Sequence, residues 1–214
     1  MRFVDRLDAG RKLTARLGDL FGRDGVVLAI PRGGAVVGGV LARSLGWPLD
    51  LVIPRKIGAP QNPELAVGAV AQDGRAIFDR RLLERLHLTE EDLAQRVAAE
   101  RDEIIRRMRR YRGREDYPPY RGTALIVDDG IATGYTALAA IGSVREILAP
   151  EQVILAVPVA PPDTVLFLES EVDRLVCLDT PAHFYAVGQF YERFDEVSDE
   201  EVAALLEEYG RLGK

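Results

Sequence analysis

Leu125-Ile-Val-Asp-Asp-Gly-Ile-Ala-Thr-Gly-Tyr-Thr-Ala137 joins an apolar run, two adjacent acids and a glycine-containing loop in thirteen consecutive residues. The unbroken apolar run that ends at Val127 is typical of a strand covered on both faces of a parallel sheet. Asp128 and Asp129 follow it directly, and an Ala-rich helical pattern begins after the loop. Ligands of open α/β sheets bind at the carboxyl ends of strands. We therefore expect a ligand site at this segment.

The loop itself has the composition of an anion-binding site. Gly130 and Gly134 allow backbone N–H groups to turn toward an anion, and the helix that follows presents the positive end of its dipole to the same anion. Two carboxylates would repel a phosphate, so we expect them to bind sugar hydroxyls or a divalent cation. The same residues would also suit an ordinary strand-to-helix connection, and the pattern alone leaves that alternative open.

This segment closely resembles the phosphoribosyl diphosphate (PRPP) signature of type I phosphoribosyltransferases. The signature consists of a hydrophobic strand, two acidic residues, a short loop and Thr-Gly-x-Thr. The matching residues are Asp128, Asp129, Thr133, Gly134 and Thr136, all within residues 125–137. The Gly-Lys-Ser/Thr triplet of nucleotide triphosphatases, by contrast, does not occur in the sequence.

The composition restricts the class of protein. A chain of 214 residues with 47% apolar and 29% charged residues suits a single globular domain over residues 1–214. Its net charge of −6 argues against general nucleic-acid binding. No apolar run approaches the ~20 residues of a membrane span, and the start lacks a signal-peptide core, so we expect a cytoplasmic protein. Cys177, the only cysteine, is expected to be a buried strand residue and not a catalytic thiol.

Short apolar strands alternate with helical patterns along the chain. This alternation predicts an α/β fold with a doubly wound, mainly parallel sheet. Residues 57–64 are expected to form a loop, and Asp73-Gly74 is a hairpin signal between the apolar runs 65–72 and 75–78. The predicted strands are 26–30, 49–53, 125–127, 153–157 and 172–178; the predicted helices are 8–21, 35–45, 79–112, one from the signature loop to 148, one from 161 to about 170, and a last one from 198.

The expected element order is compatible with the type I phosphoribosyltransferase core. The sequence pattern predicts a hairpin and helical insert at residues 75–116, where the family carries a mobile catalytic loop that is normally short. The helical character of this insert departs from the family pattern. The resemblance also implies a C-terminal hood with the final helix at residues 178–214, which in the family covers the acceptor. The aromatic residues in this last part either stack on a base or fill a core; they are Phe184, Tyr185, Phe190 and Tyr191.

Two further features could bind an anion. Strand, glycine turn and helix start recur at residues 29–34. Consecutive N–H groups from Gly33 to Ala35, with the Arg32 side chain, could bind an anion there; an ordinary turn is the alternative. The family has a diphosphate loop here, often with a cis non-proline peptide, and a basic residue near the end of the next strand contacts the diphosphate. We choose Lys56 over Arg55, since neighbours on a strand point oppositely. A surface lysine is the alternative.

The run from Arg106 to Arg114 contains six arginines. A nucleic-acid patch is one interpretation. We favour a solvated helix face neutralised by nearby acids, namely Asp102, Glu103, Glu115 and Asp116.

The resemblance implies transfer of the 5-phosphoribosyl group from PRPP to a nitrogenous base, with release of diphosphate and with Mg²⁺ as cofactor. Alternatives are a non-catalytic PRPP-binding regulator and a sugar-phosphate hydrolase. Ala132 occupies a position where several purine-using relatives carry an Asp, so the implied acceptor is left open. We expect no nucleic-acid or membrane partner, and a homodimer as the assembly.

The resemblance also implies the residues of the site. The implied catalytic residues are Asp128, Asp129 and Lys56, with the two aspartates as direct or indirect metal ligands. The implied 5-phosphate residues are Gly130, Ile131, Ala132, Thr133, Gly134, Tyr135 and Thr136. The implied diphosphate residues are Arg32, Gly33, Gly34 and Lys56.

Overall fold

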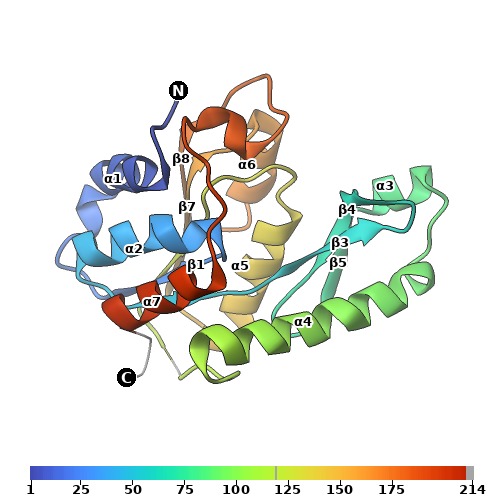
Figure 1. The fold of residues 1–214 in the computed structure, drawn as a ribbon, viewed down its shortest axis with the longest axis horizontal. Helices are drawn as coiled ribbons and strands as arrows, with labels where there is room; N and C mark the ends of the chain where they lie inside the picture. The colour runs from blue at the N-terminus through green and yellow to red at the C-terminus, as the bar shows by residue number, and fades with distance from the viewer. Residues whose placement is uncertain (119, 211–214) are drawn as a thin grey trace.

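A computed structural model describes residues 1–118 and 120–210 and contains a five-stranded parallel sheet (Figure 1). The strand order reverses between β1 and β6, because the chain adds β2 on one side of β1 and all later strands on the other. Such a switch point is where the loops at the carboxyl ends of two strands diverge and leave a crevice. In spatial order the strands are β2 (Leu49–Leu51), β1 (Gly25–Ala29), β6 (Thr123–Val127), β7 (Gln152–Val159) and β8 (Arg174–Asp179).

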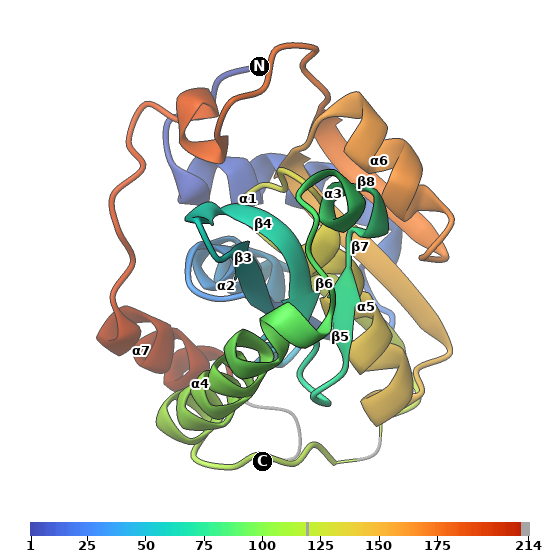
Figure 2. The ribbon, with the colours of Figure 1, turned by 90° about the vertical axis from the view of Figure 1, so that its right-hand side faces the viewer.

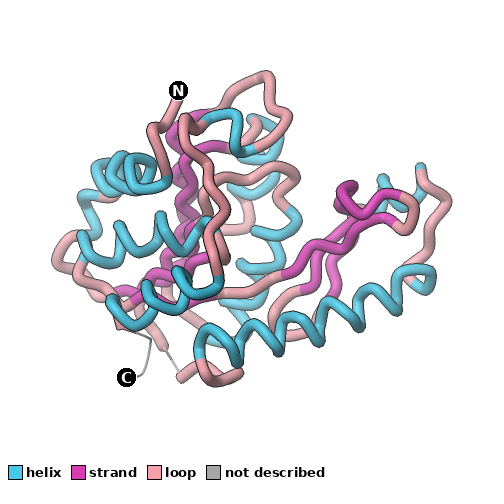
Figure 3. The backbone as a smooth tube through the Cα atoms, viewed as in Figure 1, coloured by secondary structure: helices cyan, strands magenta, loops and turns pink. Residues whose placement is uncertain are grey.

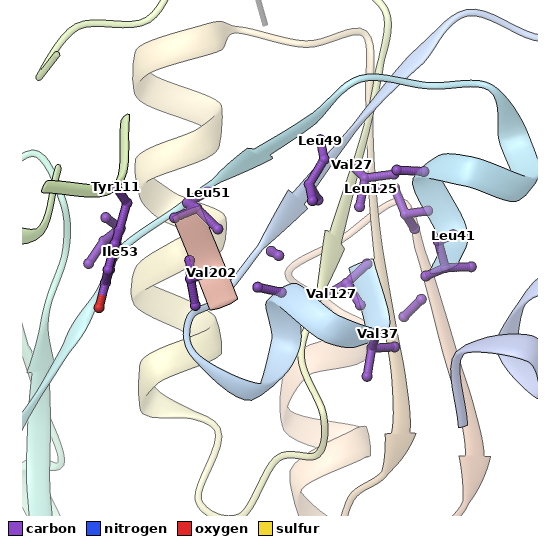
Figure 4. Packing of buried hydrophobic residues seen from close by; sticks show 14 of the residues in the cluster. Val27, Val37, Leu41, Leu49, Leu51, Ile53, Tyr111, Leu125, Val127 and Val202 are labelled. Atoms are coloured by element: carbon purple, nitrogen blue, oxygen red, sulfur yellow. The ribbon is translucent and has the colours of Figure 1, made fainter. Parts of the chain in front are cut away.

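Helices cover both faces of this sheet, and strand side chains alternate between two cores. Val27, Leu125 and Val127 enter the first core, which Figure 4 shows from close by, whereas Val26 and Ile126 enter the second. Burial on both faces explains why these strands read as unbroken apolar runs. The first face carries α1 (Arg6–Arg16), α2 (Gly33–Leu45) and α7 (Asp199–Tyr209); the second carries α5 (Tyr135–Leu148) and α6 (Pro162–Glu169).

A second, antiparallel sheet projects from one end of the parallel sheet (Figures 1 and 2). We call residues 55–112 the arm. Figure 3 shows its strands standing apart from those of the main sheet, with a long helix beneath them. The arm comprises β3 (Arg55–Ala59), β4 (Asn62–Val70), β5 (Ala76–Phe78), α3 (Arg80–Arg85), the 3₁₀ turn η2 (Glu91–Leu93) and α4 (Ala94–Arg112).

The arm departs from the sequence-based expectations in two places. The predicted loop over residues 57–64 is wrong, because β3 and β4 pair there as a hairpin with an irregular register near Gly58. Glycine and proline are poor strand formers, and Pro60 and Pro63 conceal this pairing in the sequence. Residues 79–112, predicted to be helical, are so only in part, since the chain leaves helical geometry between α3 and η2, where His87 has a φ of 54°.

The boundaries of the other elements shift by a few residues. The first helix begins at Arg6 and ends at Arg16, followed by the 3₁₀ turn η1 (Gly18–Leu20), whereas residues 8–21 were predicted as one helix. β2 ends at Leu51, two residues before the predicted Ile53. The hairpin at Asp73-Gly74 is confirmed, with β4 and β5 on either side of it. The antiparallel pairing of the arm begins at Arg55, so the arm starts before the expected insert at residues 75–116.

The C-terminal part divides into two pieces that lie far apart. Residues 187–194, which we call the cap, include the 3₁₀ turn η3 (Val187–Phe190) and pair with the N-terminal segment. Phe3 N donates to Phe190 O at 2.8 Å, and Glu192 N donates to Phe3 O at 2.8 Å. The final helix α7 instead packs against α2 and α4, on the first face of the sheet. Residues 211–214 of the expected hood at 178–214 lie outside the described residues.

No helix within residues 1–118 and 120–210 combines the length and apolar character that crossing a membrane would require.

Candidate functional site

A pocket of about 380 Å³ lies at the switch point between β1 and β6. Three separate parts of the chain form its walls. They are the end of β1 (Ile30, Pro31), the arm (Lys56, Leu65, Ala66) and the loop after β6 with the first turn of α5 (Asp128, Gly130, Ile131, Ala132, Thr133, Gly134, Thr136, Ala137). The structure therefore brings together most of the residues that the sequence analysis assigned to the 5-phosphate loop, together with Asp128 and Lys56.

The loop after β6 is shaped by Gly134, which caps α5. Its φ of 86° is left-handed, and a Cβ there would lie 3.1 Å from Thr164 Cγ2. Only glycine adopts this conformation at low cost. Thr164 Oγ1 donates a hydrogen bond to Ala132 O at 2.7 Å, so α6 fixes the loop from behind. The first N–H groups of α5 have no intrahelical acceptor, and they present positive charge to the loop. An anion fits this geometry.

The two adjacent aspartates face different surroundings. Asp128 lines the pocket, and its Oδ1 accepts a hydrogen bond from Asp129 N at 2.8 Å. Burial and the neighbouring Asp129 charge raise the pKa of Asp128 well above its usual range. Asp129 is not among the lining residues of the pocket. Its Oδ2 accepts a hydrogen bond from Arg6 Nε at 2.7 Å. No sequence pattern indicated Arg6, because it lies at the start of an ordinary amphipathic helix.

The loop after β1 packs directly against the acidic pair. A Cβ on Gly33 would lie 1.8 Å from Asp129 Oδ2, and one on Gly34 would lie 2.8 Å from Val127 O, so only glycine fits at either position. The Pro31–Arg32 peptide bond is cis, as the resemblance implied for this loop. Ala35 N donates to Arg32 O at 3.0 Å and is thus engaged within the helix start. The predicted run of anion-facing N–H groups is therefore shorter than expected.

The basic residues predicted for the diphosphate separate. Lys56 lines the pocket, whereas Arg55 Nε donates to Glu100 Oε2 at 2.7 Å on α4. Strand alternation thus places the two side chains as expected. The Arg32 side chain, however, pairs with Glu196 and lies 3.8 Å from Asp199, beside a different surface hollow. Arg32 was predicted to bind diphosphate at the pocket. In the structure its side chain instead pairs with acidic residues just before and at the start of α7 and does not line the pocket.

Tyr135, the remaining predicted 5-phosphate residue, also lies outside the pocket lining. Its ring centroid is 5.7 Å from that of Phe167 on α6. Burial and the Asp79 carboxylate raise the pKa of its hydroxyl. The side chain thus packs between the arm and α6, and only its backbone belongs to the loop.

Within the described part of the chain, no cluster of three or more His, Cys, Asp or Glu residues could hold a metal ion. Mg²⁺ does not need such a cluster, because it keeps several waters and binds through one or two carboxylates and substrate phosphates. Asp128 fits that role, since it lines the pocket, whereas the Asp129 carboxylate is paired with Arg6.

The arginine run is mostly neutralised by acids on the surface, as favoured above. Within α4, Arg106 and Arg107 both pair with Glu103. Acids outside the helix neutralise two more arginines, since Arg109 pairs with Glu115 and Arg110 pairs with Glu200. Arg112 is the exception. Its side chain is fully buried and pairs with Asp50 at 2.6 Å, so its assignment to a solvated face is wrong.

The aromatic residues near the C-terminus mainly fill a small core under the cap. The rings of Phe184 and Phe190 are 5.1 Å apart, and Tyr191 packs 5.3 Å from Phe3. Tyr185 alone is 89% exposed. Core filling is therefore the better interpretation for three of the four.

Cys177 is half-buried on β8, somewhat less than expected. Its thiol donates to Asp179 O at 3.2 Å. Burial raises the pKa of the thiol to about 11, so little nucleophilic thiolate exists at neutral pH.

Comparison with known proteins agrees with this geometry. The chain matches the family described as phosphoribosyl transferase domain over residues 5–195. Two curated relatives from Mycobacterium tuberculosis strains, provisionally named phosphoribosyl transferases, are each 46% identical over 209 residues. The match covers 96% of this chain and 46% of each relative, so the chain spans about half their length. The crystal structure of TT1426 from Thermus thermophilus is 41% identical, with a TM-score of 0.79 over 98% of this chain and 99% of that one.

Proposed function

Because this chain belongs to the phosphoribosyl transferase domain family, we propose that it transfers the 5-phosphoribosyl group of PRPP to a nitrogenous base and releases diphosphate. One observation carries the proposal. Lys56 comes from a distant part of the sequence, yet it lines one pocket with Asp128 and with every residue from Gly130 to Thr136 except Tyr135. A phosphate loop, a carboxylate and a cation in one pocket match the three parts of PRPP.

Each part of the ligand has a complementary group in this arrangement. The 5-phosphate accepts hydrogen bonds from the loop and the first turn of α5, where the helix dipole adds attraction. The Asp128 carboxylate accepts hydrogen bonds from the ribose hydroxyls. The Lys56 ammonium lies near the diphosphate and offsets its negative charge.

The reaction needs positioning and electrostatics more than proton transfer. A nitrogen of the acceptor forms a bond to the anomeric carbon while the bond to the diphosphate oxygen breaks, and its electron pair leaves with diphosphate. The developing positive charge on the sugar is near Asp128, and the negative charge on the leaving group is near Lys56. Mg²⁺ bound with the ligand, and held by Asp128 directly or through water, would supply further charge neutralisation on diphosphate.

The acceptor side of the pocket lacks an acid at residue 132. Ala132 lines the pocket next to Ile131, and the facing wall from the arm is formed by Leu65 and Ala66. These side chains offer contact area and no general base. We therefore propose that the acceptor loses its proton without help from this position, which suits a base whose reacting nitrogen is already nucleophilic.

Diphosphate release in the presence of Mg²⁺, PRPP and a panel of bases tests this function. The proposal predicts release only with a suitable base. Release without any base would indicate a hydrolase, and PRPP binding without turnover would indicate a regulator. Asp128→Asn should lower turnover at least tenfold, which is about 1.4 kcal/mol. The matched control is Asp19→Asn, an exposed aspartate paired with Arg174 outside the pocket, which should leave turnover unchanged.

A further inference from the structure

Arg6 and Asp129 form an ion pair that the proposed reaction does not use. The Arg6 Nε to Asp129 Oδ2 distance is 2.7 Å, and the two side chains are only 12% and 13% exposed. The residues are 123 positions apart in the sequence. A pair this well shielded from water interacts more strongly than a surface ion pair. It connects the first turn of α1 to the signature loop.

Arg6 is itself fixed by Phe194, the last residue of the cap, and by Asp195, which follows it. Its guanidinium carbon lies 3.9 Å from the centroid of the Phe194 ring, a cation–π arrangement. Its NH1 group donates to Asp195 O at 2.7 Å. Three directions of the planar guanidinium are thus committed, to Asp129, to an aromatic face and to a backbone carbonyl. A lysine could supply the charge but not this geometry.

Asp129 is enclosed to a similar degree. The Tyr191 hydroxyl donates to the backbone oxygen of Asp129 at 2.5 Å, and Gly33 packs so closely that a Cβ there would lie 1.8 Å from Asp129 Oδ2. Asp128, its neighbour, instead lines the pocket. The two acids of the signature therefore point to different partners, one to the ligand site and one to the protein.

We infer that the acidic pair is divided in function: Asp128 is the ligand-binding carboxylate, and Asp129 is a positioning residue that Arg6 neutralises and holds. This inference rests on the proposed function and deepens it. The Arg6–Asp129 pair fixes the signature loop to the N-terminal segment and the cap. It also prevents an unpaired negative charge from lying beside a site for a ligand with two phosphate groups, where like charges repel.

A double-mutant cycle separates this arrangement from a general structural role. The variants are Arg6→Gln, Asp129→Asn and their combination, and the measurement is the Kd of PRPP with Mg²⁺ by titration calorimetry. Arg6→Gln should weaken binding about tenfold, because the Asp129 charge is then unpaired. Asp129→Asn should weaken binding less than threefold. The combination should return to within threefold of the wild type, because the unpaired charge is gone.

Two further variants serve as references. Asp128→Asn should weaken PRPP binding at least tenfold. Arg193→Gln removes an ion pair with Asp5 at 2.6 Å that also joins the N-terminal segment to the cap, and this pair does not include Asp129. This variant should leave the Kd of PRPP unchanged. That result would show that a link between the N-terminal segment and the cap does not by itself affect PRPP binding. Urea denaturation of every variant confirms that it is folded, and Arg6→Met replaces Arg6→Gln in the cycle if the latter does not fold.

The outcomes are distinguishable. If Asp129→Asn weakens PRPP binding as much as Asp128→Asn, Asp129 contacts the ligand and the inference is overturned while the proposed function stands. The inference also fails if Arg6→Gln binds PRPP like the wild type, or if the double variant shows no recovery. A folded wild-type protein that binds no PRPP at all would overturn the proposed function, and this inference with it.

Discussion

The parallel sheet and the arm differ in how they are held together. In the sheet, β1 and β6 are buried on both faces and pair in regular register from one end to the other. In the arm, β3 and β4 pair with an irregularity, and α4 and α5 both pack against its sheet. The comparison indicates a division of labour. The rigid sheet carries the phosphate loop and Asp128, and the more separate arm brings Lys56 to the same pocket.

The arm shares apolar packing with the core of the parallel sheet and with α5, and buried polar contacts also join it to the sheet at its base. Arg112, at the end of α4, pairs with Asp50 on β2 and lies 3.5 Å above the Tyr117 ring. Tyr117 in turn donates to Leu51 O and contacts Gln72. Because these polar groups are buried, their interactions are costly to break.

Replacing Arg112 should have the largest effect. Arg112→Met leaves the Asp50 carboxylate buried without its partner, and we expect a loss of about 3–5 kcal/mol in the free energy of unfolding. Urea denaturation measures it. The matched control is Arg109→Met, at an exposed residue of the same helix that pairs with Glu115. This variant should change the free energy of unfolding by less than about 0.5 kcal/mol. Equal effects for the two variants would mean that the base of the arm is not its anchor.

A substitution in the phosphate loop tests the other side of the comparison. Gly134→Ala forces a left-handed conformation on a residue with a Cβ, at a cost of about 1–2 kcal/mol. The loop should distort to relieve it, so PRPP affinity falls along with stability. Gly46→Ala, at a left-handed helix end with open space around it and far from the pocket, should cost similar stability and leave PRPP binding unchanged. Equal PRPP affinity in both variants would argue against the phosphate loop.

The neighbouring cations on β3 provide a smaller and more specific test. Lys56→Met should weaken PRPP binding about fivefold, close to 1 kcal/mol, because a pocket-lining charge is lost. Arg55→Met removes an equal charge that faces α4 instead, and should change the Kd less than twofold. Titration calorimetry of both variants compares them. If Arg55→Met weakened binding as much as Lys56→Met, the effect would be general electrostatics and not contact with diphosphate.

The smallest expected effect concerns pH and the outer face of α4. Hydrogen bonds from Arg106 and Arg107 lower the pKa of Glu103 to about 2 from an ordinary 4.5. A lowered pKa means that the stabilisation is complete above pH 4.5 and disappears as the pH falls toward 2. Because the pair is at the surface, we expect less than about 1 kcal/mol. Glu103→Gln should therefore be slightly less stable than the wild type at pH 6 and equal to it near pH 2; a constant difference across this range would contradict the assignment.

The sequence predicted the sheet and the loop after β6 because those features are local. An apolar run, two acids and glycines at fixed spacing are sufficient to place β6, Asp128 and the start of α5. The pocket-facing side of Lys56 followed from strand alternation, even though β3 itself was not predicted. Gly58 and the nearby prolines hide that strand, and its stability comes from pairing with β4.

The ion pairs that organise the molecule had no signal in the sequence. Arg6 with Asp129, and Asp50 with Arg112, join residues 123 and 62 positions apart. An arginine at the start of a helix and another in a charged run look like ordinary surface residues. The same reason explains the misplacement of Arg32, whose partners Glu196 and Asp199 meet it only after α7 has packed against α2. Such contacts depend on the tertiary fold and not on local pattern.

A crystal structure of the protein with PRPP and Mg²⁺ tests the account most directly. We predict the 5-phosphate at the N–H groups of residues 133–136, the ribose hydroxyls at Asp128, and the diphosphate beside Lys56, with Arg6 still paired to Asp129. A sugar phosphate bound elsewhere on the protein, with the pocket between the sheet and the arm left unoccupied, would contradict the account.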